Sequence, residues 1–226
     1  IDPDFNFLRQ NCKNSAYYLD TEFNDLVKKN SFCDRNLSLL HFNARSLLNK
    51  MDDFVYFINS LDFKFSIIAV TETWANESNE TAMHIPGYNR YLKSRHNRSG
   101  GGVALFVKDT LSFKVRVDLN TCSFDCEDVD VAFIDIDKTT IGVIYRPPGG
   151  DLLKFNQCYS VLLDKVSTSK NKCLICGDFN INLLKYEAHS ETENFLNDVF
   201  SHFQYPVINR PTRFCQTTST LIDNIY

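Results

Sequence analysis

The residues best suited to chemistry follow the apolar run 172–176, which leads directly into Gly177-Asp178-Phe179-Asn180. A strand that ends at a glycine lets the backbone turn sharply, so a carboxylate and a carboxamide two residues apart can project together from the edge of a sheet. Such a pair could activate a water molecule and hold it in place. An ordinary Asx-type turn after a strand is the alternative interpretation of the same segment.

Four other polar residues stand in the same relation to apolar runs. Asn43 closes residues 37–42, Glu72 closes 67–71, Tyr145 closes 141–144 and Asp223 follows 221–222. An isolated carboxylate at the end of a buried strand is costly to desolvate, which favours a compensating cation beside Glu72. A helix cap is the alternative for Glu72, and a packed core or rim aromatic is the alternative for Tyr145.

Seven short stretches occur in one order along residues 37–226: His41-Phe42-Asn43-Ala44-Arg45-Ser46-Leu47, Thr71-Glu72-Thr73-Trp74, Gly100-Gly101-Gly102-Val103-Ala104-Leu105, Ile144-Tyr145-Arg146-Pro147-Pro148, Gly177-Asp178-Phe179-Asn180, Pro211-Thr212-Arg213 and Ser219-Thr220-Leu221-Ile222-Asp223. In these stretches the chain resembles the endonuclease/exonuclease/phosphatase superfamily. Within it, the resemblance is to the apurinic-like endonuclease domain of non-LTR (LINE-type) retrotransposons.

The resemblance implies a catalytic Mg²⁺, or Mn²⁺, held by Glu72 with help from Asn43. Mg²⁺ keeps most of its waters and needs only one or two carboxylates, so sparse protein ligation is expected. Asp178 would be the general base that takes a proton from the attacking water, and Asn180 would orient Asp178 and the phosphate. The phenol of Tyr145 would act on the phosphate or the transition state.

The resemblance also implies a substrate-binding group and a supporting carboxylate. Thr212 matches a position near the substrate, while Arg213 and Arg146 could pair with a phosphate. Asp223 matches the carboxylate of an Ile-Asp segment that supports the active site. Many relatives read Ile-Asp-His there, whereas this chain has Asp223-Asn224.

One basic segment could contact nucleic acid. The formal net charge is −4, so any attraction to DNA must be local. Residues 88–98 contain no acid and carry five basic side chains: Arg90, Lys93, Arg95, His96 and Arg98. A solvated strand and hairpin tip is one interpretation. The other is a loop that follows phosphates, with Arg95 and Arg98 binding substrate.

One expected segment is missing. Relatives carry a downstream Ser-Asp-His segment whose histidine contacts the scissile phosphate, and none of the five histidines of this chain lies in such a segment. The chain starts at Ile1 and stops at Tyr226, so we expect a fragment of a longer polypeptide that is incomplete at the C-terminus. A sheet edge would then be left unpaired, and residues 1–226 alone would have weak or no activity.

Composition sets the broad class. A length of 226 residues with 43% hydrophobic content suits one α/β domain, which we expect at residues 37–226 after an N-terminal extension or linker at 1–36. With no bilayer-length apolar run or signal peptide, we expect an intracellular protein. The resemblance implies that it acts in the nucleus. The eight cysteines should then be reduced, and Cys173 and Cys176 should point to opposite faces of a strand as buried thiols.

Periodicity predicts helices around residues 47–58, 152–166 and 190–203, the last opened by a Ser190–Glu193 capping box. Strands are predicted at 66–73, 88–94, 101–107, 113–118, 129–136 and 140–145. This pattern alone gives an α/β or α+β fold with many strands. The resemblance implies the more specific four-layer α/β/β/α sandwich of two mostly antiparallel sheets flanked by helices.

The leading hypothesis is a Mg²⁺-dependent endonuclease that nicks target DNA, where a reverse transcriptase encoded downstream in the same polypeptide would start copying. One alternative is a phosphatase-like or sphingomyelinase-like hydrolase on the same scaffold. Another is a truncated or domesticated copy that binds nucleic acid or a partner without cutting. A downstream Ser-Asp-His followed by reverse-transcriptase sequence would favour the nuclease.

Overall fold

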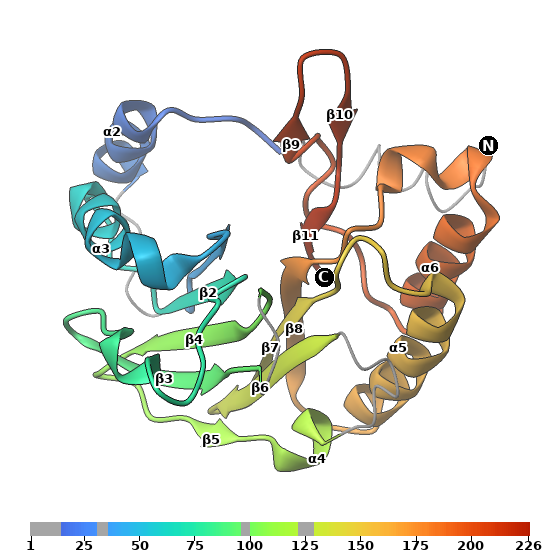
Figure 1. Cartoon of the computed structure of the whole chain (residues 1–226), viewed down its shortest axis with the longest axis horizontal. Coiled ribbons are helices and arrows are strands. Elements are labelled where there is room, and N and C mark those ends of the chain that lie inside the picture. Colours follow the sequence, from blue (N-terminus) through green and yellow to red (C-terminus); the bar gives the residue numbers. More distant parts are fainter. Residues whose placement is uncertain (1–14, 31–35, 96–99, 122–128) are drawn as a thin grey trace.

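The computed structural model describes residues 15–30, 36–95, 100–121 and 129–226. Two sheets lie face to face in it (Figure 1). The first has the order β1-β2-β4-β3, with β1 (Leu39–Asn43), β2 (Ile67–Thr71), β4 (Val103–Lys108) and β3 (Tyr88–Lys93). The second has the order β11-β8-β7-β6-β5, with β11 (Asp223–Ile225), β8 (Lys172–Asp178), β7 (Thr139–Tyr145), β6 (Asp130–Ile136) and β5 (Lys114–Val115). A small hairpin pairs β9 (Arg213–Phe214) with β10 (Ser219–Thr220).

Helices cover the outer face of each sheet, which confirms the predicted sandwich of two sheets flanked by helices (Figure 1). The 3₁₀ helix η1 (Leu47–Lys50) and α3 (Met51–Ser60) pack on the first sheet. The second sheet is covered by α5 (Leu152–Ser167) and α6 (Ser190–Ser201). Shorter helices are η2 (Glu80–Ala82), α4 (Val117–Asn120) and η3 (Leu183–Ala188). No helix in the described ranges is long and apolar enough to cross a membrane.

Side chains alternate between the two faces of each strand, and together with the helices they form three separate hydrophobic cores. In β2, Ile67 and Ala69 face the second sheet, whereas Ile68 and Val70 face α3. Adjacent side chains of a strand point to opposite faces, so an apolar strand such as this one is buried on both sides. The same rule places the thiol of Cys176 between the sheets and that of Cys173 towards α5 and α6, as predicted.

Two local predictions were wrong. The strand expected at 113–118 is limited to Lys114–Val115, because the side chain of Asn120 takes over the pairing: its amide accepts from Phe133 N at 2.7 Å and donates to Phe133 O at 3.1 Å. At α6, the capping residue is His189, whose Nδ1 accepts from the main-chain N–H of Thr192 at 3.3 Å. The Ser190–Glu193 pair is therefore inside the helix and is no capping box.

The N-terminal segment lies against both sides of the domain. Tyr17 Oη donates to Pro211 O at 2.8 Å, near β9. Residues 15–19 then run across to α2 (Asp20–Asn30) beside α3, as Figure 1 shows in blue. There the ring of Phe23 stacks on Phe65 with centroids 6.0 Å apart, and Lys28 pairs with Asp62 at 2.8 Å. Residues 15–30 thus pack on the sandwich, and a domain boundary at residue 37 stays a prediction.

Candidate active site

Strand register brings three of the predicted residues into one row. Asp178 is the last residue of β8, and it pairs with Tyr145 of β7 on one side and with Asp223 of β11 on the other. Residues in direct register on neighbouring strands place their side chains on the same face of the sheet. Tyr145, Asp178 and Asp223 therefore share one edge of the second sheet.

Asn43 connects this row to the first sheet. It ends β1 opposite Thr71, the last residue of β2, and Glu72 follows. The Asn43 Nδ2 group donates to Asp178 Oδ2 at 2.6 Å and to Glu72 Oε1 at 3.0 Å. One amide thus joins a carboxylate from each sheet.

The backbone is strained at this edge. Seven described residues other than glycine have positive φ, and five of them lie here: Arg45 (42°), Ser46 (77°), Glu72 (55°), Trp74 (55°) and Asn180 (49°). Each such conformation costs on the order of 1 kcal/mol or more and persists only where the surroundings enforce it. Strained backbone conformations often cluster at functional sites, and here they cluster where the strands end.

The Gly177-Asp178-Phe179-Asn180 segment shows why each residue type is required. A Cβ on Gly177 would lie 1.9 Å from the main-chain oxygen of Ile144, so only glycine allows β8 to approach β7 this closely. Phe179 is 1% exposed in the core under α5 and α6, which anchors the turn. Asp178 Oδ1 accepts from Asn180 N at 3.0 Å, the hydrogen bond of an Asx turn. Here the turn also orients the carboxylate.

Asn180 therefore holds Asp178 through its main chain. Its side chain is used elsewhere, because Nδ2 donates to Arg146 O at 2.7 Å. The geometry supports the predicted orientation of Asp178, while a contact between Asn180 and the phosphate stays a prediction.

Burial and like charge perturb the acids of this row. The pKa of Asp178, which is 2% exposed, is raised to about 7, first by desolvation and then by the charge of Asp223. Desolvation also raises the pKa of Asp223, whose Oδ1 is buried without a hydrogen-bond partner among the described residues. Burial and the charge of Glu72 raise the pKa of Tyr145 to about 12, so its phenol keeps its proton at neutral pH.

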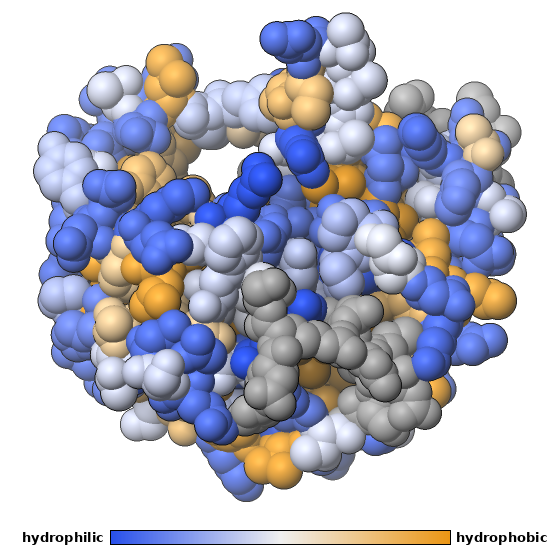
Figure 2. Space-filling model, viewed as in Figure 1, coloured by the Kyte–Doolittle hydropathy of each residue, from blue (hydrophilic) through white to orange (hydrophobic). Residues whose placement is uncertain are grey.

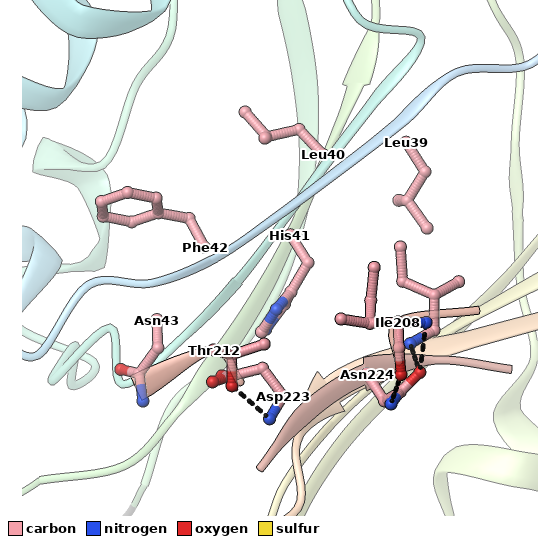
Figure 3. A pocket seen from close by; sticks show the side chains of 10 residues that line it. Leu39, Leu40, His41, Phe42, Asn43, Ile208, Thr212, Asp223 and Asn224 are labelled. Atoms are coloured by element: carbon pink, nitrogen blue, oxygen red, sulfur yellow. Dashed lines mark hydrogen bonds between the residues drawn. The ribbon is translucent and has the colours of Figure 1, made fainter. Parts of the chain in front are cut away.

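A pocket of about 450 Å³ adjoins the site between the edge strands β1 and β11 (Figure 3). Asn43, Thr212 and Asp223 lie at one end of it, and Leu39 and Ile225 are among the apolar residues that line it. The Thr212 hydroxyl oxygen accepts from the main-chain N–H of Asp223 at 3.2 Å. Thr212 thereby holds Asp223, and its contact with substrate stays a prediction.

The predicted substrate-binding arginines lie in different settings. Arg213 is exposed on β9, and its charge offsets part of the increase that desolvation causes in the pKa of Asp223. Arg146 instead points inward: it is 4% exposed and donates to the carbonyls of Phe179, Asn180 and Gly150. This geometry assigns Arg146 to holding the turn and disfavours the predicted direct contact with a phosphate.

The basic segment 88–98 is mostly engaged within the protein. Arg90 donates to Met83 O, and Lys93 donates to Asn120 O at 3.2 Å. Arg95 binds both carboxylate oxygens of Asp130 at 2.8 and 3.0 Å, with its guanidinium carbon 5.7 Å from the Tyr145 ring centroid. Arg95 therefore adjoins the site, whereas Arg98 and His96 lie outside the described residues.

Sequence reasoning did not assign a role to Arg45 or Trp74, which flank the site. Arg45 and Trp74 are both exposed, and each lies within two residues of a predicted metal ligand, Asn43 or Glu72. Their positive φ values could not be read from residue type. Their position in the sequence could have indicated them, because each lies two residues after a polar residue at a strand end.

The donor set fits a hard divalent cation. The oxygens of Glu72, Asp178 and Asp223 lie at one edge, although no group of three or more His, Cys, Asp or Glu side chains in the described ranges is placed to hold a metal ion. Mg²⁺ suits such sparse ligation because it retains several waters. The uncompensated Asp223 Oδ1 and the raised pKa of Asp178 also indicate an edge that attracts positive charge.

A sequence profile of the Endonuclease/Exonuclease/phosphatase family matches residues 36–225. The chain belongs to this family. Searching curated proteins gave no match. The strand-end row of this Endonuclease/Exonuclease/phosphatase chain corresponds to the site predicted from its motifs, and the individual roles stay predictions.

Solved structures share the fold of this family member at low identity. The endonuclease domain of TRAS1, a telomere-specific non-LTR retrotransposon, is 12% identical with a TM-score of 0.59 over 84% of this chain and 83% of its own. The 3′-5′ exonuclease NExo from Neisseria meningitidis is 14% identical with a TM-score of 0.62, covering 84% and 86%. The AP endonuclease LMAP from Leishmania major is 14% identical with a TM-score of 0.62, covering 97% and 85%.

Proposed function

We propose that this chain hydrolyses phosphodiester bonds of DNA with the help of Mg²⁺ or Mn²⁺. The observation that carries the proposal is the Asn43 amide, which holds Asp178 at 2.6 Å and Glu72 at 3.0 Å. It places a base of raised pKa next to a carboxylate suited to a metal.

Asp178 is the general base of this reaction. With a pKa of about 7, its carboxylate is basic enough to accept a proton from water yet partly ionised at neutral pH. The Asn180 N–H fixes Oδ1 and the Asn43 amide fixes Oδ2, so the carboxylate keeps one orientation. As the water oxygen bonds to phosphorus, its proton passes to Asp178 and one P–O ester bond breaks.

Two further groups act on the phosphate. Glu72 and Asn43 would hold the divalent ion, which supplies charge stabilisation for the phosphoryl oxygens and the leaving oxygen. Tyr145 keeps its proton at neutral pH, so its hydroxyl can donate a hydrogen bond to a phosphate oxygen. Arg146 keeps the 178–180 turn in position through its carbonyl contacts.

The biological role that we propose is nicking of target DNA by a retrotransposon endonuclease, followed by reverse transcription from a downstream domain. The retroelement-like motifs 144–148 and 219–223 support it, and we propose that the protein acts in the nucleus.

Divalent-ion binding and plasmid nicking test the proposal. Calorimetry with Mg²⁺ and Mn²⁺ should show binding that Glu72→Gln weakens and that Glu80→Gln, at a half-buried glutamate of η2, leaves unchanged. A polypeptide that carries these residues together with a downstream Ser-Asp-His should nick supercoiled plasmid only with the metal. Equal metal affinity in wild type and Glu72→Gln, or nicking in a chelator, would refute it.

A further inference from the structure

Trp74 is an exposed indole beside the catalytic row. It is 41% exposed, although its neighbours Thr73 and Ala75 are 0% and 4% exposed. Its Nε1 donates to Glu72 Oε2 at 3.4 Å, so the ring adjoins the carboxylate assigned to the metal. A large apolar side chain left in water next to a polar site is informative, because its burial would otherwise stabilise the fold.

The backbone around Trp74 is held from two sides. Its N–H donates to Gly101 O at 2.9 Å, and the N–H of Thr73 donates to Gly102 O at 3.2 Å. Both Glu72 and Trp74 have φ of 55°, a conformation that persists only when its surroundings enforce it. The main chain that carries the indole is thus fixed in place before any ligand binds.

Arg45 lies on the loop that adjoins the same carboxylate. The next residue, Ser46, donates its N–H to Glu72 O at 2.9 Å, and the N–H of Arg45 itself donates to Asn43 Oδ1 at 3.3 Å. Arg45 is exposed, and no hydrogen bond or ion pair of its guanidinium is found among the residues that the structure describes. It is a cation available at the rim of an otherwise acidic site.

We propose that Trp74 stacks on a nucleobase beside the scissile phosphate and that Arg45 contacts a neighbouring phosphate of the same strand. This deepens the proposed DNA hydrolysis and rests on it. Aromatic faces and cations together are what a nucleic-acid strand requires, since every base has a π-face and every nucleotide a charge. With a net charge of −4, such recognition must come from local groups of this kind. Figure 2 shows one side of the molecule, on which hydrophilic residues are widespread.

The proposal predicts a preference for DNA in which a base next to the cut is unstacked. Inside a regular duplex both faces of a base are covered by its neighbours, so an indole gains access only when a base leaves the stack. Single-stranded DNA, or a duplex with a mismatch at the target, should bind more tightly than a fully paired duplex.

Intrinsic fluorescence provides a direct test, because Trp74 is the single tryptophan of the chain. In a chelator, which prevents cutting, titration with a single-stranded oligonucleotide should quench the emission. By anisotropy of labelled DNA, Trp74→Leu should weaken binding about tenfold or more, whereas Trp74→Phe retains most of the affinity. The matched control is Tyr56→Leu on α3, where the ring is 79% exposed and the residue lies outside the seven motif stretches.

Salt dependence tests Arg45. Arg45→Gln should reduce the slope of log K against log[salt] by roughly 0.7–0.9, the change expected for one lost phosphate contact. Lys138→Gln removes an exposed charge from the opposite end of β7 and should leave the slope unchanged. Equal slopes in wild type and Arg45→Gln would overturn the assignment of Arg45.

The outcome separates this inference from the proposed function. If Trp74→Leu binds DNA and cuts it with unchanged KM while Asp178→Asn is inactive, stacking by Trp74 is wrong and the hydrolase stands. If the wild type, in a polypeptide that also carries the downstream Ser-Asp-His, neither binds nor cuts DNA, both fail together. A raised KM at nearly unchanged kcat in Trp74→Leu supports the inference.

Discussion

Strand β7 has a cluster of charged groups at each of its ends, and the two clusters are built in opposite ways. At Tyr145, the carboxylates of Asp178 and Asp223 lie side by side, and the pKa of each is raised. At the other end, Arg116 binds Asp118 at 2.7 and 2.8 Å and Asp135 at 3.4 Å. That contact lowers the pKa of Asp118.

The comparison separates charge arranged for chemistry from charge arranged for folding. In the Arg116 cluster (Arg116, Asp118, Asp135 and Thr140) each negative group has a positive or hydrogen-bonding partner: the Thr140 hydroxyl donates to Asp135 at 2.6 Å. In the strand-end cluster (Asn43, Glu72, Tyr145, Asp178 and Asp223) acids face acids, and they are moderated by amides, main-chain groups, the indole N–H of Trp74 and the charge of Arg213. Repulsion left in place is consistent with a site that recruits a cation.

The largest difference should appear in activity. Asp178→Asn should lower nicking by about 10³-fold or more, since an amide cannot accept the proton of water and the residues of such a site act as a unit. Asp135→Asn, at the opposite end of the same sheet, should leave kcat and KM unchanged. Plasmid nicking in Mg²⁺ measures both variants, each in a polypeptide that also carries the downstream Ser-Asp-His. Comparable losses in the two would mean that the clusters do not differ in function.

The same Asp178→Asn substitution that lowers activity should raise the free energy of unfolding. The pKa of Asp178 is about 7 in the folded chain against 3.8 ordinarily, so the folded state retains a proton that the unfolded chain loses between about pH 4 and pH 7. Asp178 therefore lowers the free energy of unfolding as pH rises through that window. In a chelator at pH 8, Asp178→Asn should raise that free energy by about 2–4 kcal/mol.

Urea titrations check this expectation, and the gain should shrink as the pH falls from 8 to 5. A gain that stays constant with pH would show that Asp178 ionises normally in the folded protein.

Metal binding should distinguish the clusters next. Glu72→Gln should weaken Mg²⁺ or Mn²⁺ affinity at least about tenfold, equivalent to roughly 1.4 kcal/mol, because an amide is a poorer ligand than a carboxylate. Asp118→Asn removes an acid that Arg116 already neutralises and should leave the calorimetric titration unchanged. Weaker metal binding in Asp118→Asn would place an ion where we do not expect one.

The smallest effect should come from Arg116 itself. Arg116→Gln leaves the exposed Asp118 in water and the partly buried Asp135 with the Thr140 hydroxyl, so the loss in unfolding free energy should be about 1 kcal/mol. Thermal unfolding in low and high salt measures it, with DNA nicking as the parallel readout. Changed nicking with unchanged stability would reverse the roles of the two clusters.

The sequence alone predicted the strand-end positions of Asn43, Tyr145 and Asp178, because apolar runs that stop at a polar residue need only periodicity. Asp223 instead begins β11, since residues 221–222 form no strand. The family motifs added the architecture and the pairing of roles, which periodicity could not provide. The sequence did not predict which way individual side chains point. The guanidinium of Arg146 is chemically suited to bind a phosphate, yet it donates to the carbonyls of Phe179 and Asn180.

The missed features depend on conformation or on distant contacts. Nothing in the residue types of Glu72 and Trp74 indicates positive φ, because residues with a Cβ rarely adopt it. Likewise the Asn120 amide ends the β5 pairing through Phe133, which lies on another strand. Such contacts exist only once the sheets are assembled, so local pattern cannot predict them.

Because the Asn43 amide bridges the two sheets, the geometry of the site depends on how the sheets are aligned. Its two hydrogen bonds, at 2.6 and 3.0 Å, end on strands from different layers. Sliding one layer past the other by a fraction of an ångström would lengthen one of them, since hydrogen bonds tolerate little displacement. The side chains that pack between the layers, such as Ala69 and Val143, therefore help to keep the two hydrogen bonds of Asn43 at their lengths.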